Sequence, residues 1–249
     1  MHQTEQKMNL HTKCPNCGTD FEQKDITTPP ISYPISTWPF TQKMFPIQKR
    51  FGLATFGNGF VNSRSIYNHV IDLEPTVPVD DKSGDHFEKV SQFIIQYFKN
   101  QFLEECKGIG FDLNLLSDEH RPFGFQFAGF NKDKEGKTFP ITHRMYIGKS
   151  PMVVPFTSLG CSPTGDDSVA KILWQDNKNI ANYSAFSLQD AIDYAKFLIR
   201  STADFQRFFS GKFRTVGGDI DIALITNHRG FQWIEQKTLY RMLDKEASI

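Results

Sequence analysis

The order in which strand-like and helix-like segments follow one another constrains the fold of this 249-residue chain more than any other feature. A strand pattern near residue 51 precedes two helical patterns, and several strand patterns, two further helical patterns and two closing strands follow. Paired helices between antiparallel strands cannot build a doubly wound parallel sheet. The order predicts an α+β fold in which two antiparallel sheets stack and helices cover their outer faces, a four-layer αββα sandwich.

The first two helices are expected from their capping residues. Asn62 is expected to cap a helix over 63–73. Asp85, with Glu88 as its reciprocal partner, is expected to cap a longer helix that ends near Cys106. One face of that helix carries apolar side chains at helical spacing: Phe87, Val90, Ile94, Tyr97 and Phe98.

A second pair of helices is expected after residue 165. The first is short and covers 167–174, and the second is the clearest helical pattern in the chain. Ser187 and Asp190 form the capping signature of the longer helix. Its expected buried stripe consists of Leu188, Ala191, Ile192, Ala195, Leu198, Ile199 and Thr202.

Alternating apolar residues predict the strands. Phe123, Phe125 and Phe127 alternate with small or polar residues, and the charged run 132–137 is typical of a hairpin tip before a returning strand at 143–148. Further strands are expected at 51–56, at 153–156, around 220–224 and, after a hairpin at 228–230, at 231–234.

Composition excludes several classes of protein. Lys and Arg together number 28, as do Asp and Glu, so no basic excess favours binding to a nucleic acid. No apolar stretch is long enough to span a membrane. The cysteines are too sparse for a disulfide-stapled secreted domain, and residues 1–10 lack the apolar core of a signal peptide. We therefore expect a cytoplasmic protein.

Residues 1–40 are polar, interrupted by prolines, and expected to form an irregular N-terminal arm before a folded domain at 41–249. The arm contains CPNCG at 14–18, which resembles one knuckle of a zinc ribbon, with Cys14 and Cys17 as thiolate ligands of a structural zinc ion. No second Cys-x-x-Cys completes a four-ligand site. A redox-active cysteine pair and a degenerate knuckle without metal remain alternatives.

Three segments together resemble proteasome β-type subunits and bacterial proteasome-like proteins, which are N-terminal nucleophile (Ntn) hydrolases. The segments are QKMFPIQKRFGLATFGNG (42–59), SLQDAIDYAKFLIRSTADFQRFF (187–209) and TVGGDIDIALITNHRGFQWIEQK (215–237). The resemblance covers about residues 43–240. It implies the αββα fold already expected from the order of elements, and it implies assembly into a homo-oligomer or a larger complex.

The resemblance also implies site residues. Lys43 matches the lysine that keeps the potential around the nucleophile positive, and Gly57, fourteen positions later, matches the glycine whose N–H stabilises the oxyanion. Thr12 and Cys14 lie at about the right distance before Lys43 to be the nucleophile, which self-cleavage would have to expose. A solvated lysine and a turn glycine are the simpler interpretations of Lys43 and Gly57.

The chain departs from the family where the nucleophile should be. The segment after Thr12 is polar and does not have the pattern of the two core strands that the resemblance requires. The sequence therefore favours a non-catalytic scaffold or regulatory relative. One alternative is a self-processed Thr or Cys peptidase or amidase acting on peptides, and a second is a partner-binding module that uses the CPNCG arm.

Overall fold

The computed structural model describes residues 12–13, 20–21, 42–79, 85–174, 181–209 and 215–237. Within them the chain has an α+β fold built on a five-stranded antiparallel sheet. The helices are α1 (Ile66–Leu73), α2 (His86–Gly108), α3 (Ser168–Trp174) and α4 (Leu188–Phe208), with short 3-10 turns η1 (Glu74–Thr76), η2 (Leu113–Leu115) and η3 (Tyr183–Ala185). The strands are β1 (Thr12–Lys13), β2 (Asp20–Phe21), β3 (Met44–Ile47), β4 (Phe51–Gly57), β5 (Phe60–Val61), β6 (Arg64–Ser65), β7 (Phe123–Lys132), β8 (Thr138–Ile147), β9 (Met152–Phe156), β10 (Ile222–Thr226) and β11 (Gly230–Glu235).

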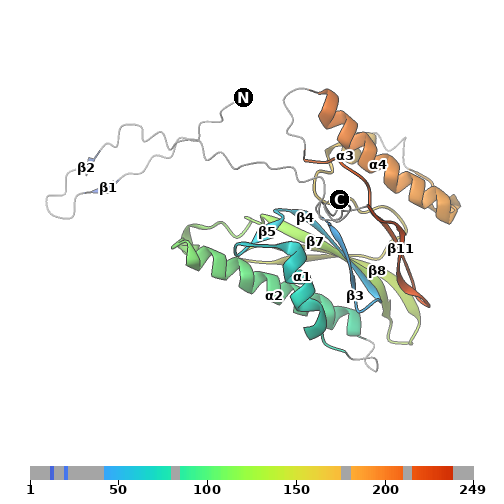
Figure 1. The fold of residues 1–249 in the computed structure, drawn as a ribbon, viewed down its shortest axis with the longest axis horizontal. Coiled ribbons are helices and arrows are strands. Elements are labelled where there is room, and N and C mark those ends of the chain that lie inside the picture. Colours follow the sequence, from blue (N-terminus) through green and yellow to red (C-terminus); the bar gives the residue numbers. More distant parts are fainter. Residues whose placement is uncertain are drawn as a thin grey trace, which may run out of the picture.

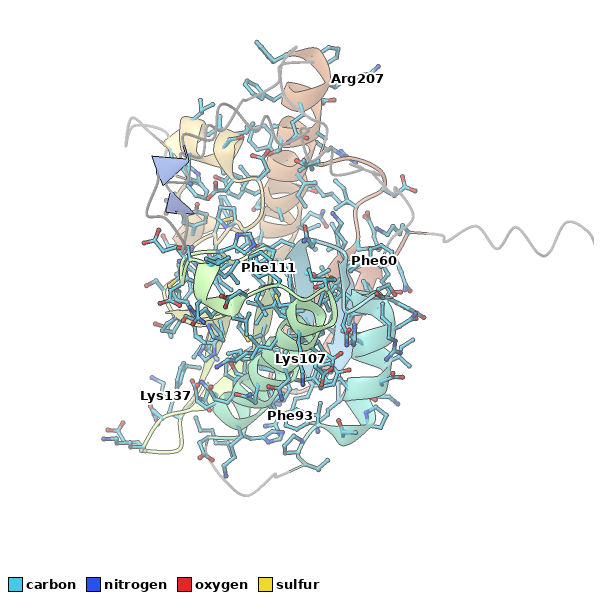
Figure 2. The ribbon with its side chains drawn as sticks, turned by 90° about the vertical axis from the view of Figure 1, so that its left-hand side faces the viewer. Phe60, Phe93, Lys107, Phe111, Lys137 and Arg207 are labelled. Carbon is cyan, nitrogen blue, oxygen red and sulfur yellow. The ribbon has the colours of Figure 1, made fainter. Side chains whose placement is uncertain are left out.

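The five-stranded sheet has the order β3-β4-β7-β8-β9, and every neighbouring pair is antiparallel. β7 and β8 form the long hairpin expected from the alternation, and Lys137 lies near its tip, away from the body of the protein (Figure 2). β4 pairs with β7 although α1 and α2 separate them in the sequence. Both helices therefore form a single insertion between neighbouring strands.

Phenylalanine side chains fill the layer between α2 and this sheet. Phe87 of α2 stacks on Phe127 of β7 at 4.6 Å between ring centroids, and Phe98 packs on Phe125 at 4.5 Å. All four side chains are buried. Each contributes about 2–3 kcal/mol of hydrophobic stabilisation, so this layer is the principal core of the protein.

The hairpin β10–β11 packs on the opposite face of the sheet. A Cβ on Gly52 of β4 would lie 2.8 Å from Ile225 Cδ1, so the strand and the hairpin approach closely. The Phe231 N–H donates a hydrogen bond to the Lys49 carbonyl oxygen at 3.0 Å, which anchors β11 to the turn between β3 and β4. Figure 1 shows α1 and α2 on one side of the sheet and α3 and α4 on the other.

The structure corrects the expected start of α1. Asn62 and Ser63 form the turn between β5 and β6 with positive φ angles of 49° and 59°, and Ser65 is the residue that caps the helix. The Ser65 side chain accepts a hydrogen bond from the Asn68 N–H at 3.2 Å. A two-residue turn that favours Asn competed with the capping role that the sequence suggested.

The start of α2 also differs from the expected capping box. Asp85 occupies the N-cap position, but its side chain makes no capping hydrogen bond and pairs instead with Lys89 at 3.2 Å. Glu88 turns toward His143 of β8. The helix continues to Gly108, two residues beyond the expected end.

The capping box of α4 is confirmed, whereas its expected buried stripe is confirmed only at Leu198 and Thr202. Ser187 and Asp190 exchange hydrogen bonds as the sequence predicts. The buried residues of α4 are Leu198, Thr202 and Gln206, while most of the expected stripe faces solvent. None of the described helices combines the length and apolar character that crossing a bilayer requires.

Candidate functional site

Lys43 and Gly57, far apart in sequence, lie at the same end of the five-stranded sheet. β3 and β4 form an antiparallel hairpin, and the Thr55 N–H donates a hydrogen bond to the Lys43 carbonyl oxygen at 2.8 Å. Gly57 is the last residue of β4, two positions beyond Thr55. The hairpin therefore brings these two predicted site residues onto neighbouring strands at one edge.

The backbone conformation at Gly57 explains why this position holds a glycine. Its φ angle is 80°, in the left-handed region that favours glycine. A Cβ here would lie 2.4 Å from the Pro122 carbonyl oxygen and 2.8 Å from the Phe123 Cα. The close passage of the backbone before β7 thus requires glycine whether or not the Gly57 N–H takes part in catalysis.

Lys43 lies beside a second lysine. Part of its side chain is exposed, yet the surrounding protein still disfavours its charged form. The pKa of Lys43 is lowered, first because burial removes water from the ammonium group and second because Lys237 repels it. The family resemblance assigns this lysine a positive local potential, and the lowered pKa weakens that charge while the neighbouring Lys237 adds to it.

The nearby carboxylate of Asp221 is committed to Lys237. The Lys237 ammonium lies 3.3 Å from the Asp221 carboxylate, and the Lys237 N–H donates to the same carboxylate at 2.8 Å. Both side chains are at least 90% shielded from solvent. Within the described part of the chain, Lys43 has no acidic partner of its own, so the site carries an excess of positive charge.

Thr12 is not brought into the sheet that carries Lys43. It lies in β1, which pairs with β2 through the registers Thr12 with Phe21 and Lys13 with Asp20. This pair is a separate two-stranded sheet, drawn apart from the five-stranded sheet in Figure 1.

The zinc-knuckle residues Cys14 and Cys17 lie outside the described residues, as does most of the arm. In the described ranges no group of three His, Cys, Asp or Glu side chains could hold a metal ion. Cys106 is buried and Cys161 is half-buried, and burial raises the pKa of both thiols. A raised thiol pKa opposes the thiolate form that metal binding and nucleophilic attack require.

The structure reveals a second constellation that the sequence did not suggest. Ser91 Oγ of α2 lies 2.8 Å from His143 Nδ1 of β8, and His143 Nε2 lies 3.2 Å from Glu88 Oε1. The order Ser, His and carboxylate matches that of hydrolase triads. The pKa of His143 is lowered, chiefly because the ring is buried, while the Glu88 charge opposes that shift.

Accessibility excludes this constellation as a catalytic triad in the observed conformation. Ser91 is fully buried and His143 is 3% exposed, whereas the Glu88 side chain is 43% exposed. A catalytic serine must be accessible to its substrate, but here the serine is buried and the carboxylate is the exposed member of the three. The arrangement is a satisfied polar network inside the core.

Part of this network had a sequence signal. His143 alternates with Ile141 and Met145, which places its ring on the buried face of a strand. A buried imidazole needs a polar partner, and Ser91 is a polar residue on the buried face of α2. The pair of Lys237 and Asp221 had no comparable signal, because Lys237 lies beyond the end of β11.

Comparisons of the chain with models of protein families, with curated proteins and with solved structures found no match.

Proposed function

We propose that the chain is a proteasome-β-like αββα protein that acts as a non-catalytic scaffold or regulatory relative of Ntn peptidases and assembles with further copies. The element order supports the fold, since a hairpin, two helices, three strands, two helices and a closing hairpin follow one another. The packing of β10–β11 on the face of β4 opposite α2 supports stacked sheets between helical layers.

One observation carries the non-catalytic part of the proposal. Lys43 and Gly57 lie at one end of the five-stranded sheet, whereas among the described strands the one that contains Thr12 pairs only with β2. Within the described residues, the second sheet consists of β10 and β11 alone. The strand that should present an N-terminal nucleophile next to Lys43 is not among them.

The experiment is the intact mass of the purified chain together with a peptidase assay. We expect no cleavage before Thr12 or Cys14, and hydrolysis of peptide-amide substrates no faster than in buffer. Lys43→Ala should then alter neither the absence of cleavage nor the rate of hydrolysis. The control Lys107→Ala, at the C-terminal end of α2, should also alter neither. A chain that starts at Thr12 or Cys14, with peptidase activity lost in Lys43→Ala but kept in Lys107→Ala, would overturn the proposal.

The alternative is a self-processed Thr or Cys hydrolase. The lowered pKa of Lys43 and the position of Gly57 on the neighbouring strand favour it, because both would serve a nucleophile placed between them. The intact mass separates the two functions. The third interpretation, a partner-binding CPNCG arm with structural zinc, concerns residues outside the described ranges and stays a prediction.

A further inference from the structure

A polar cleft of about 530 Å³ lies between α4 and the open end of the hairpin β10–β11. Two cationic side chains of α4 line one wall, Lys196 and Arg200. The other wall comes from the loop before β10 and from the end of β11, through Gly218, Asp219, Glu235 and Lys237. None of these residues belongs to the expected catalytic set, and Lys237 is the lysine that lowers the pKa of Lys43.

Two ion pairs hold the walls of the cleft. The Lys196 ammonium pairs with the Glu235 carboxylate, which connects α4 to β11, and the Lys196 side chain is only 17% exposed. Lys237 pairs with the buried Asp221 carboxylate behind the cleft. Since both carboxylates are engaged, neither is free to neutralise further cations.

The remaining charges around the cleft are unequal. Arg200 follows Lys196 by one helical turn, so both face the cleft, and within the described ranges no acceptor binds its guanidinium. Lys43 also lacks an acidic partner in the part of the chain that the structure describes, although its lowered pKa weakens its charge. Asp219 is the one lining carboxylate that forms no ion pair among the described residues. Positive charge therefore exceeds negative charge in and beside the cleft.

We propose that this cleft is an oxyanion-binding site in which Arg200 binds a phosphate or carboxylate group, while the ammonium groups of Lys196 and Lys237 stay in their ion pairs. A guanidinium offers two parallel N–H donors that match two oxygens of such a group. Gly218 lies on the rim with a φ angle of 80° and no side chain, which leaves the approach open. Asp219 opposes the anion and limits its affinity. The inference does not depend on the proposed scaffold function, because it uses neither a nucleophile nor cleavage of the chain.

The test titrates the full chain with inorganic phosphate by calorimetry, with sodium chloride at matched ionic strength as the reference and acetate as a second titrant. We expect phosphate to bind with a dissociation constant on the order of 1 mM. Arg200→Gln should weaken binding at least roughly tenfold, because it removes charged hydrogen bonds. Asp219→Asn should tighten binding. If acetate binds more tightly than phosphate, the ligand class is a carboxylate.

Arg207→Gln is the matched control, since Arg207 lies in the last turn of the same helix, away from Arg200 (Figure 2). It should bind phosphate as the unaltered chain does. Circular dichroism confirms that each variant is folded, and Arg200→Lys, which keeps the charge but loses the two-pronged geometry, should bind with intermediate affinity. The proposal would be overturned if neither titrant bound more than the chloride reference. It would also be overturned if Arg200→Gln and Arg207→Gln weakened phosphate binding equally.

Discussion

At the scale of single residues, the hydrogen-bonded chain of Ser91, His143 and Glu88 joins α2 to β8 in the core. Both ring nitrogens of His143 have partners, and the ring packs edge-on against Phe87 at 4.9 Å. Removing one partner would leave a buried polar group unsatisfied, at a cost of about 1–3 kcal/mol. The charge state of His143 thus bears on the stability of the fold.

Acidification should destabilise the protein through His143. Its pKa is lowered in the folded state, so the unfolded chain binds a proton more readily. Stability contributed by the neutral ring is full above the unfolded pKa of about 6.5 and falls as the pH drops from there toward the folded pKa. We expect the urea concentration at the midpoint of unfolding to decrease when the pH is lowered from about 7.5 to about 5.5. The decrease should be smaller in His143→Gln.

Two variants sharpen this prediction. Glu88→Gln removes the charge that opposes the lowering of the His143 pKa, so its acid-induced loss should be larger than that of the unaltered chain. His228→Gln, in the exposed turn before β11, should behave like the unaltered chain. An identical pH response in His143→Gln and the unaltered chain would contradict the linkage.

Gly57 allows a second test at this scale. Gly57→Ala should reduce the free energy of unfolding by about 2 kcal/mol or more, because the left-handed backbone and the 2.4 Å approach to the Pro122 carbonyl oxygen both exclude a methyl group. Gly59→Ala is the control, since a Cβ there meets no atom within 4 Å. It should change stability by no more than about 0.5 kcal/mol. Equal effects in chemical denaturation would show that the close approach is not maintained in solution.

At the scale of elements, the start of α4 is determined by its own sequence, whereas its buried face is determined by the elements that pack on it. The capping box depends on residues three positions apart, so it could be predicted and is confirmed. The buried face depends on which side of the helix meets α3 and η3. Gln206 is buried because its side chain bonds Asp166, Thr215 and the Val216 N–H, and a polar residue in that role gives no apolar signal.

The cap of α4 gives the prediction at this scale. Ser187→Ala removes the acceptor for the Asp190 N–H and should lower the free energy of unfolding by about 1 kcal/mol. Ser187→Gly should cost only a few tenths of that amount. Thermal unfolding of the two variants under one buffer condition is the measurement. A larger loss in the glycine variant than in the alanine variant would contradict the capping role.

The strands show the same division. The alternation of Phe123, Phe125 and Phe127 was sufficient to predict β7, because a half-buried strand needs a period of two. The start of α1 was not predictable in the same way, since Asn62 suits both a cap and a tight turn. Local chemistry could not decide between these roles, and the pairing of β5 with β6 did.

At the scale of the whole molecule, several large apolar side chains of α4 remain exposed. Leu188, Phe197, Ile199 and Phe208 are between 41% and 71% exposed. Apolar surface of this kind favours association. The family resemblance named Lys43 and Gly57 as candidate site residues, whereas the positive charge of Lys237 beside Lys43 had no sequence signal, because only the tertiary fold brings it near.

We expect the protein to be an oligomer whose contacts include α4. Light scattering across micromolar concentrations should give a mass above that of one chain, and Ile199→Glu should reduce it. Leu115→Glu, which alters an exposed leucine in η2, is the control and should leave the mass unchanged. A monomeric mass for the unaltered protein throughout this range would refute the assembly prediction.

The pairing of β4 with β7 also has a consequence for synthesis. The stretch 58–122 separates the two strands, so β4 leaves the ribosome well before its partner exists. At about 5–20 residues per second, the interval is several seconds. During that time one edge of β4 and its apolar side chains Phe51 and Leu53 lack the contacts that later bury them. The nascent chain therefore presents a chaperone-binding or aggregation-prone segment until the β7 hairpin emerges, and codons that slow translation between α2 and β7 would lengthen this exposure.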